Sequence, residues 1–162
     1  MEEELEPRPP HETDLVSLCA ALNAQDARYI VVGGMAVLYH GFMRATEDID
    51  LLLETSRDNQ NRIRQALEVL PDKAIREMAE GDLDEYGVVR VGDEITVDLM
   101  MSACGITYEQ AKGEIEYAVI NGVSIPFASA RLLLRMKQTY REKDIPDRIF
   151  LQEKLLRESE KQ

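Results

Sequence analysis

The sequence predicts an α/β (α+β) domain in which helices alternate with strands and two further helices close the chain. Two observations support this fold class. Segments with helical spacing of apolar residues alternate with short β-branched segments in the first half of the 162 residues. Several strand-like segments then follow one another around glycine turns before helical patterns return. A chain of this length is the size of one ordinary domain.

The composition excludes several classes of protein. With 44% apolar residues the chain can bury a core, and its two cysteines, Cys19 and Cys104, lack the spacing of a zinc site or a disulfide framework. The longest apolar stretch, residues 29–38, is too short to span a bilayer. The N-terminus is acidic, whereas a secretory signal begins with positively charged residues. A net charge of −12 disfavours general DNA binding. We therefore expect a cytoplasmic protein without membrane contact.

The first 11 residues are acidic and proline-rich, and we interpret them as a disordered leader before a single domain over residues 12–162. We expect its catalytic core at about residues 27–100 and its C-terminal helices at about 129–158. Apolar spacing, β-branched runs and turn residues predict the individual elements. In order, they are a helix over 14–24 capped by Thr13, a strand over 28–32, a helix over 35–39, a strand over 48–53, a helix from Ser56 to Pro71, hairpins turning at Gly92-Asp93 and Asn121-Gly122, and helices over 129–142 and 144–158.

Acidic residues on two of these strands predict a metal site. Alternation along a strand places Asp48 and Asp50 on one face, and Asp98 occupies the same kind of position in Ile95-Thr-Val-Asp-Leu-Met. If the two strands are neighbours, three carboxylates converge. Each like-charge pair at about 4 Å then costs roughly 4 kcal/mol at an effective dielectric of about 20. Oxygen-only ligands beside substrate phosphates suit Mg²⁺. An isolated Asp-x-Asp at a strand edge would otherwise be a structural feature.

A glycine pair and an arginine accompany this cluster. Gly33-Gly34 ends a strand and opens a helix, which is an arrangement that attracts phosphate. Only 13 residues separate Gly34 from Asp48, so both can line one cleft. Arg44 could pair with a phosphate through two parallel hydrogen bonds, and a salt bridge to Glu47 or Glu54 is the alternative.

Together these residues resemble the nucleotidyltransferase superfamily, which has a DNA polymerase β-like fold. The matching motifs are Val32-Gly33-Gly34, Asp48-Ile49-Asp50 and Val97-Asp98-Leu99. Within the superfamily, GGMAVLYHGFMRATEDIDLLLE is most similar to small bacterial proteins related to abortive-infection type IV toxins. Leu133-Leu-Arg-Met-Lys137, Arg141-Glu-Lys-Asp144 and Asp147 resemble the C-terminal pattern of that group. Gly-Gly replaces the Gly-Ser of the small antitoxin-type members.

The resemblance implies a mixed β-sheet flanked by helices. For the activity, it implies a metal-dependent transfer, with Mg²⁺ or Mn²⁺, of a nucleoside monophosphate from a nucleoside triphosphate (NTP) onto RNA or protein. It also implies a toxin–antitoxin or phage-defence setting and a cognate antitoxin as partner. Asp48, Asp50 and Asp98 would be catalytic and bind the metal, and Asp98 would also take the proton of the attacking hydroxyl. The nucleotide would be bound by Gly33, Gly34, Arg44, Thr46 and Lys137. For Lys137, an ordinary solvated helix charge is an equal alternative.

Two other functions remain open from the sequence. One is nucleotidyl transfer onto a small molecule such as an antibiotic, because an acidic surface suits a cationic drug. The other belongs to a different class: a nucleotide-sensing or partner-binding module on the same scaffold without turnover. Label transfer onto macromolecules would separate the first expectation from both alternatives.

Overall fold

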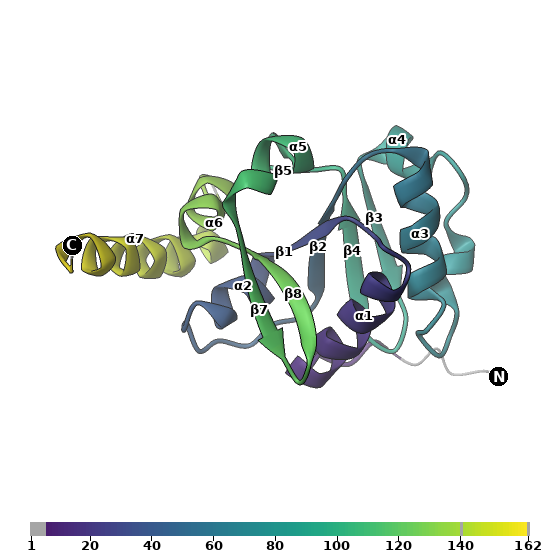
Figure 1. Cartoon of the computed structure of the whole chain (residues 1–162), viewed down its shortest axis with the longest axis horizontal. Coiled ribbons are helices and arrows are strands. Elements are labelled where there is room, and N and C mark those ends of the chain that lie inside the picture. Colours follow the sequence, from purple (N-terminus) through teal and green to yellow (C-terminus); the bar gives the residue numbers. More distant parts are fainter. Residues whose placement is uncertain (1–5, 140, 162) are drawn as a thin grey trace.

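A mixed six-stranded sheet forms the centre of the computed structural model, which describes residues 6–139 and 141–161 (Figure 1). Its strands are β1 (Tyr29–Val32), β2 (Ile49–Leu53), β3 (Val88–Gly92), β4 (Thr96–Met100), β7 (Ile115–Ile120) and β8 (Val123–Ala128). They lie in the order β3-β4-β2-β1-β8-β7. β2 runs parallel to β4 and β1 runs parallel to β8, whereas the other neighbours are antiparallel. β5 (Ser102–Ala103) and β6 (Ile106–Thr107) form a separate small hairpin.

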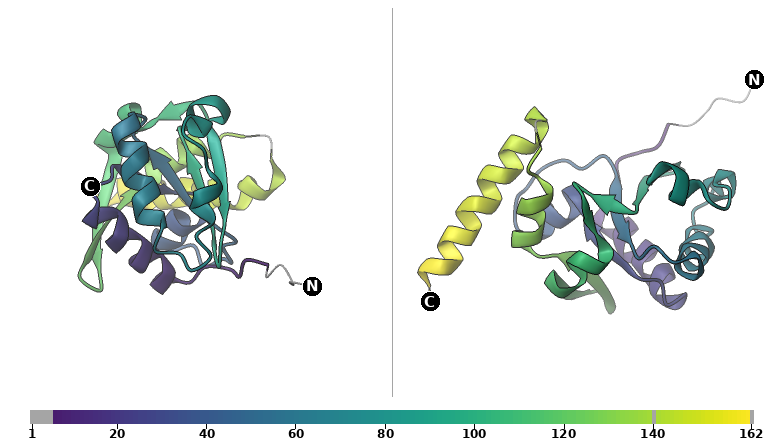
Figure 2. Two further views of the ribbon diagram at one scale, coloured as in Figure 1. Left: turned by 90° about the vertical axis from the view of Figure 1, so that its right-hand side faces the viewer. Right: turned by 90° about the horizontal axis from the view of Figure 1, so that it is seen from above.

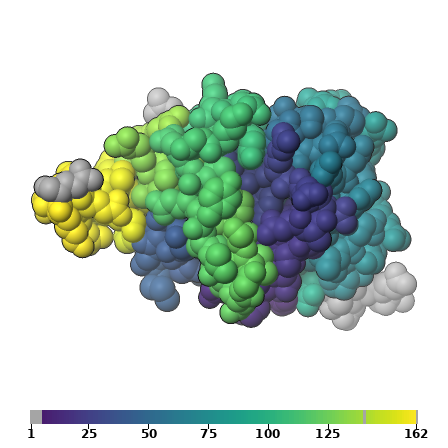
Figure 3. Space-filling model, viewed as in Figure 1, coloured from purple at the N-terminus to yellow at the C-terminus, as the bar shows by residue number. Residues whose placement is uncertain are grey.

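Helices flank this sheet, as the sequence predicts. They are α1 (Glu12–Ala24), α2 (Gly33–Tyr39), α3 (Arg57–Leu67), α4 (Asp82–Tyr86), α5 (Tyr108–Ala111), α6 (Ala130–Met136) and α7 (Ile145–Glu160), with 3-10 turns η1 (Ala74–Glu77), η2 (Lys112–Glu114) and η3 (Glu142–Asp144). α1 packs against α3 and β8, and α2 packs against β1, β2 and α6. α7 packs on α6 at one end of the molecule and projects away from the sheet (Figures 2 and 3).

The two central strands are buried along almost their whole length. Ile30 and Val31 on β1 and Leu51 to Leu53 on β2 have no exposed surface. Strands that are covered on both faces have continuous runs of apolar residues, and the sequences of β1 and β2 show such runs. Asp50 interrupts the run on β2 and is only half-buried. The single polar position of this strand is therefore at its beginning, where the strand reaches the surface of the core.

The first helix begins earlier than predicted, and part of the predicted leader is held against the domain. Helix α1 begins at Glu12, because the Asp14 carboxylate accepts a hydrogen bond from the backbone N–H of His11 at 2.7 Å; the cap predicted at Thr13 is wrong. Residues 6–11 form no helix or strand, yet both terminal nitrogens of Arg8 donate to Asp14 at 2.7 Å. Residues 1–5 lie outside the described residues, so the division into leader and domain stays a prediction.

The two predicted hairpins differ in outcome. The Asn121-Gly122 turn is confirmed, with φ of 50° and 80° at its two residues. At Gly92-Asp93 the loop is instead the three residues 93–95, and Gly92 pairs with Thr96. The buried Asp93 leaves the ladder because its carboxylate accepts hydrogen bonds from the backbone N–H groups of Asp72 and Ala74, around the start of η1. The pairing of β3 with β4 therefore has a different register from the one that a two-residue turn would give.

The predicted helix over residues 129–142 is shorter than expected. Ser129 caps it by accepting the N–H of Leu132 at 3.1 Å, but the helix ends at Met136. Beyond this point the Arg148 guanidinium binds the carbonyls of Lys137 and Thr139 at 3.0 and 2.8 Å. Those carbonyls are therefore satisfied by a side chain of α7 and not by a continued helix.

No helix among the described residues is long and apolar enough to cross a bilayer.

Candidate active site

Three carboxylates meet at one end of the central parallel strands. Asp50 on β2 is the register partner of Asp98 on β4, and Asp48 stands one residue before β2 begins. One oxygen of each carboxylate lies within 4.8 Å of the others. Strand alternation puts Asp48 and Asp50 on one face, and the parallel register brings Asp98 beside them. The structure thus brings together all three acidic residues that the sequence analysis selected.

Proximity and burial make it costly to ionise all three groups at once. Burial, followed by the charges of Asp48 and Asp98, raises the pKa of Asp50 to about 8. Burial and the charge of Asp98 also raise the pKa of Asp48, although Arg90 opposes that shift. Both shifts have the cause expected for carboxylates that share a partly desolvated site. A cation placed among the three oxygens would remove this cost.

Arg90 supplies such a cation, and the sequence analysis did not identify it. It is the register partner of Asp98 on β3, and its Nε and Nη2 donate to the two carboxylate oxygens at 2.9 Å each. Nη2 also lies 3.3 Å from Oδ2 of Asp48. The Arg90 side chain is 66% exposed, so it covers the carboxylates from the solvent side. The sequence could have placed Arg90 opposite Asp98 only if the register of the β3–β4 hairpin had been predicted correctly.

The glycine pair lies directly against the acidic cluster. Gly33 has a φ of +67°, and a Cβ at this position would lie 2.0 Å from Oδ2 of Asp50. A Cβ on Gly34 would lie 2.9 Å from Cγ2 of the buried Thr46 and 3.6 Å from Nη2 of Arg44. No side chain fits at Gly33, so the chain passes close to the carboxylates only because this residue is glycine. Four of the predicted nucleotide-binding residues therefore surround the same end of the sheet.

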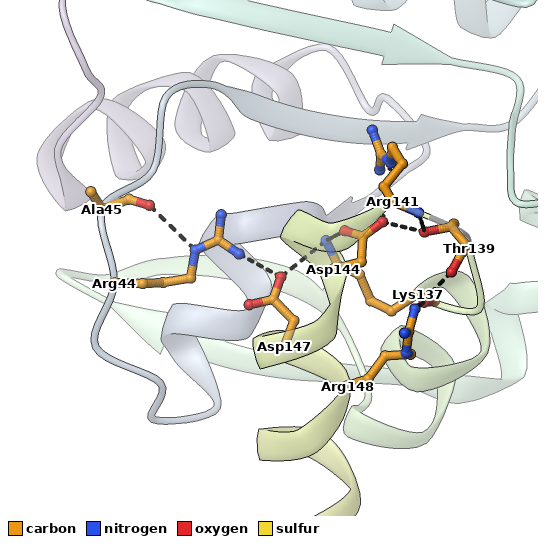
Figure 4. Close-up of polar contacts among 8 residues, drawn as sticks. All are labelled: Arg44, Ala45, Lys137, Thr139, Arg141, Asp144, Asp147 and Arg148. Carbon is orange, nitrogen blue, oxygen red and sulfur yellow. Dashed lines mark hydrogen bonds and ion pairs between the residues drawn. The ribbon is translucent and has the colours of Figure 1, made fainter.

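Lys137, the fifth predicted nucleotide-binding residue, is part of a buried ion-pair network (Figure 4). Its side chain is only 13% exposed, and Nζ lies 3.1 Å from Asp144 and 3.2 Å from Asp147. Both carboxylates are 1% exposed. Arg44 pairs with Asp147 as well, and not with either glutamate suggested by the sequence. The solvated-charge alternative for Lys137 is therefore wrong, and the network ties the loop before β2 to the start of α7.

A second set of contacts keeps Asp144 ionised. Thr139 donates its hydroxyl to Oδ2, and Nε of Arg141 lies 3.1 Å from the same oxygen. Burial alone would raise the pKa of Asp144, but the hydrogen bonds from Thr139 and Lys137 outweigh it and lower the pKa. The network thus pairs buried carboxylates with cations whose positions are fixed, beside the acidic cluster of β2 and β4.

A cavity of about 410 Å³ joins these groups. Its wall contains all three carboxylates and Arg90. From the predicted nucleotide-binding set, it contains Gly34, Arg44, Thr46 and Lys137. Gly33 lines an adjoining cavity that shares Asp50 with the first. The site therefore combines negative charge at one place with positive charge around it, which is the pattern needed to hold a metal and an anionic substrate together.

The donor set fits a hard divalent cation. Three carboxylates offer only oxygen ligands and lie close enough to share an ion. A His or Cys partner, which would favour zinc, is absent from this cluster as the described residues define it. The residues present therefore suit Mg²⁺ or Mn²⁺ in the presence of further oxygen ligands such as phosphate.

Solved structures with a similar fold are nucleotidyltransferase-like proteins. A candidate nucleotidyltransferase from Thermotoga maritima superposes with a TM-score of 0.54 at 16% identity, covering 98% of this chain and 99% of its own. An antigenic nucleotidyltransferase-like protein from Paracoccidioides brasiliensis has a TM-score of 0.51 at 19% identity, covering 89% of this chain and 78% of its own. Identities this low establish a shared fold. Among curated proteins, none matches the sequence.

A family model gives the closer assignment. The model described as "Nucleotidyl transferase AbiEii toxin, Type IV TA system" matches residues 16–146. This range includes the glycine pair, the three clustered carboxylates and the buried Lys137. The chain is therefore a nucleotidyltransferase and belongs to the AbiEii toxin family of type IV toxin–antitoxin systems.

Proposed function

We propose that this chain transfers a nucleoside monophosphate from an NTP onto an RNA or protein acceptor, with Mg²⁺ or Mn²⁺ as cofactor, in a toxin–antitoxin or phage-defence system. One observation carries the proposal: three carboxylates with oxygens within 4.8 Å of one another face a cavity whose wall also holds Arg44 and Lys137. A metal and a polyphosphate need this juxtaposition of charges, and a purely structural cluster does not.

Asp48, Asp50 and Asp98 would hold the metal. When bound, it neutralises phosphate charge and polarises the phosphoryl oxygens. Arg90 must give up its contacts to Asp48 and Asp98 for this to happen, because the same oxygens cannot serve both cations fully. Its exposed position makes such a movement inexpensive, since no packed core is disturbed.

The reaction itself exchanges one bond to the α-phosphorus for another. The acceptor hydroxyl oxygen forms a bond to the α-phosphorus, the bond to the β-phosphate oxygen breaks, and pyrophosphate leaves. Asp98 accepts the proton of the acceptor hydroxyl on a carboxylate oxygen. Its side chain is 11% exposed, so the carboxylate is shielded from bulk water but accessible from the cavity.

The phosphates would be held by the second group of residues. Gly33 and Gly34 let the backbone run against Asp50 and Thr46, so that its N–H groups lie beside the carboxylates where the phosphates would bind. Arg44 and Lys137 contribute positive charge from the side of α7. Because both are anchored by Asp147, their charges are preorganised and need not be ordered when the substrate binds.

The net charge of the chain limits the acceptors and partners that it can bind. At −12, the surface repels long phosphate backbones, so we expect contact with one RNA end or one protein side chain and no general DNA binding. We also expect a cognate antitoxin, as in the family to which the chain belongs, and a cytoplasmic site of action where NTPs are abundant.

The test is to incubate the purified protein and Mg²⁺ with each α-labelled NTP, using total RNA and cell lysate as acceptors. The Asp48→Ala/Asp50→Ala double variant serves as the inactive control, after circular dichroism has shown that it folds. Label on RNA or on a protein band with the wild type alone supports the proposal. Label on neither, with turnover of an added aminoglycoside or lincosamide, would replace it with the small-molecule alternative. Nucleotide binding without any transfer would favour a sensing module.

A further inference from the structure

A second cavity adjoins the one that contains the carboxylates. It has a volume of about 220 Å³ and shares Asp50, Met100, Lys137 and Arg141 with the first. Because the same four side chains line both cavities, the two lie side by side, and we call them the first and second compartments of the site.

The two compartments differ in chemistry. The first is lined by the carboxylates, three arginines and two lysines. The second has an apolar wall made by the buried side chains of Val32, Leu133 and Met136, by Met100 and by the small β5–β6 hairpin. Its polar lining consists of Thr139 and of the shared Asp50, Lys137 and Arg141. Apolar side chains and thioether sulfurs favour contact with an aromatic ring over contact with phosphate.

A third cavity, on the Arg90 side of the cluster, has a different character. It is open to the acidic residues Glu6, Glu47 and Asp48 and offers no buried apolar wall. Of these three cavities of the described residues, the second alone has buried apolar side chains in its wall, and it can therefore take a ring while the phosphates remain among the cations.

We propose that this second compartment is the nucleobase subsite of the NTP, formed by the end of α6 on one side and the β5–β6 hairpin on the other. The inference rests on the proposed function and adds the direction in which the substrate lies. The triphosphate occupies the compartment with Arg44 and Lys137, and the base points past Asp50 toward Met136 and Cys104.

Cys104 makes this arrangement measurable. It forms the two-residue turn of the β5–β6 hairpin with Gly105, is exposed, and lines the second compartment. The other cysteine, Cys19, is fully buried, and burial raises its thiol pKa to about 12. Since the thiolate is the reactive form, an alkylating reagent should modify Cys104 alone in the folded protein.

The first experiment measures the alkylation rate of Cys104 by N-ethylmaleimide, with mass spectrometry to locate the adduct. It compares protein alone, protein with Mg²⁺ and each NTP, and protein with Mg²⁺ and tripolyphosphate, which has no base. A saturating NTP should slow the reaction at least tenfold, because at about 90% occupancy only a tenth of the protein remains free to react. Tripolyphosphate should leave the rate unchanged.

The outcomes separate this inference from the proposed function. Binding of NTP, measured by calorimetry, without protection of Cys104 would overturn the base subsite and leave the transferase proposal intact. Equal protection by tripolyphosphate and NTP would also overturn it, because the base would then not be responsible. An absence of nucleotide binding altogether would overturn both.

A second experiment occupies the proposed base subsite with a larger side chain or with the alkyl group. The Ala103→Leu variant enlarges a side chain on the hairpin wall, and its affinity for NTP should fall about tenfold while its affinity for tripolyphosphate stays the same. Ala20→Leu, at an exposed position of α1, is the matched control and should affect neither. Alkylated wild type should lose NTP affinity likewise, whereas reagent treatment of Cys104→Ser should produce no change. Unaltered NTP binding by both Ala103→Leu and alkylated protein would reject the subsite.

Discussion

Arg90 and Asp98 lie directly opposite each other on β3 and β4, and the guanidinium of Arg90 donates to both oxygens of the Asp98 carboxylate at 2.9 Å. The arginine also reaches Asp48 at 3.3 Å. In the metal-free chain this side chain is therefore the counter-charge of the acidic cluster. A divalent ion and Arg90 compete for the same oxygens, so the affinity for metal includes the cost of displacing the arginine.

Replacing Arg90 with Gln should lower the thermal stability of the metal-free protein and increase the stabilisation that Mg²⁺ provides. Because Arg90 is 66% exposed, the lost ion pair is worth only about 1 kcal/mol, which is about 2–4 °C in Tm for a chain of this size. Thermal unfolding in EDTA and in Mg²⁺ measures both effects. Arg57→Gln removes a comparable surface pair with Asp84 far from the site and should leave the Mg²⁺ response unchanged. Equal Mg²⁺ stabilisation of Arg90→Gln and wild type would contradict the competition.

Gly33→Ala should abolish transfer for a steric reason. The new Cβ would lie 2.0 Å from Oδ2 of Asp50, so this carboxylate must move, and a displacement of about 1 Å can cost about 100-fold in rate. Gly87→Ala is the matched control, because its φ of +74° imposes the same backbone strain while no atom lies within 4 Å of the new Cβ. Both variants should lose about 1 kcal/mol of stability, but Gly87→Ala should keep transfer. Comparable activity in the two variants would rule out the steric explanation.

Part of the acidic cluster could be predicted from local alternation, because Asp48 and Asp50 share a face in any strand. The contribution of Asp98 depends on β4 lying beside β2, which the sequence allowed only as a condition and the structure supplies. The Asn121-Gly122 turn was predictable from the local sequence, since both residues tolerate positive φ. The order of most elements followed from patterns of this local kind, whereas the mixed sheet was implied only by the resemblance to the nucleotidyltransferase superfamily.

Arg90 was not predictable because its position depends on a register. A two-residue turn at Gly92-Asp93 would place Arg90 opposite Ile95, whereas the actual loop places it opposite Asp98. The extra loop residue arises because Asp93 accepts hydrogen bonds from the backbone of Asp72 and Ala74, which are distant in sequence. The early end of α6 has a similar origin, because a side chain of α7 binds the carbonyls that a longer helix would use.

Lys137→Met should destabilise the fold as well as reduce nucleotide binding. It leaves Asp144 and Asp147, each 1% exposed, with fewer counter-charges, and breaking a buried pair typically costs about 3–5 kcal/mol. Arg44 and Arg141 still contact these carboxylates, so we expect the lower end of that range. Urea unfolding measures the loss. Lys154→Met, which removes an exposed helix pair with Glu158, should cost no more than about 1 kcal/mol. A Lys137→Met variant as stable as Lys154→Met would show that the network does not hold α7.

The metal-free protein should lose stability as the pH rises from about 4 to about 8. The pKa of Asp50 in the folded state is about 8, above the ordinary value of 3.8, because of burial and the neighbouring Asp48 and Asp98. The folded state therefore binds an extra proton between these values, and the stabilisation is present at low pH and is lost as the pH passes through about 8. Asp144 titrates below this range, because its hydrogen bonds lower its pKa despite burial.

Urea unfolding in EDTA at several pH values measures this slope, and Asp50→Asn should flatten it because the substituted amide does not titrate. Mg²⁺ should reverse the trend in the wild type, since the ion binds the deprotonated carboxylates and its apparent affinity rises as protons leave. The reversal requires that proton and metal compete for the same oxygens. A wild-type stability in EDTA that is flat or rises over this range would mean that Asp50 is already ionised at neutral pH, and that Arg90 and Lys137 alone neutralise the cluster.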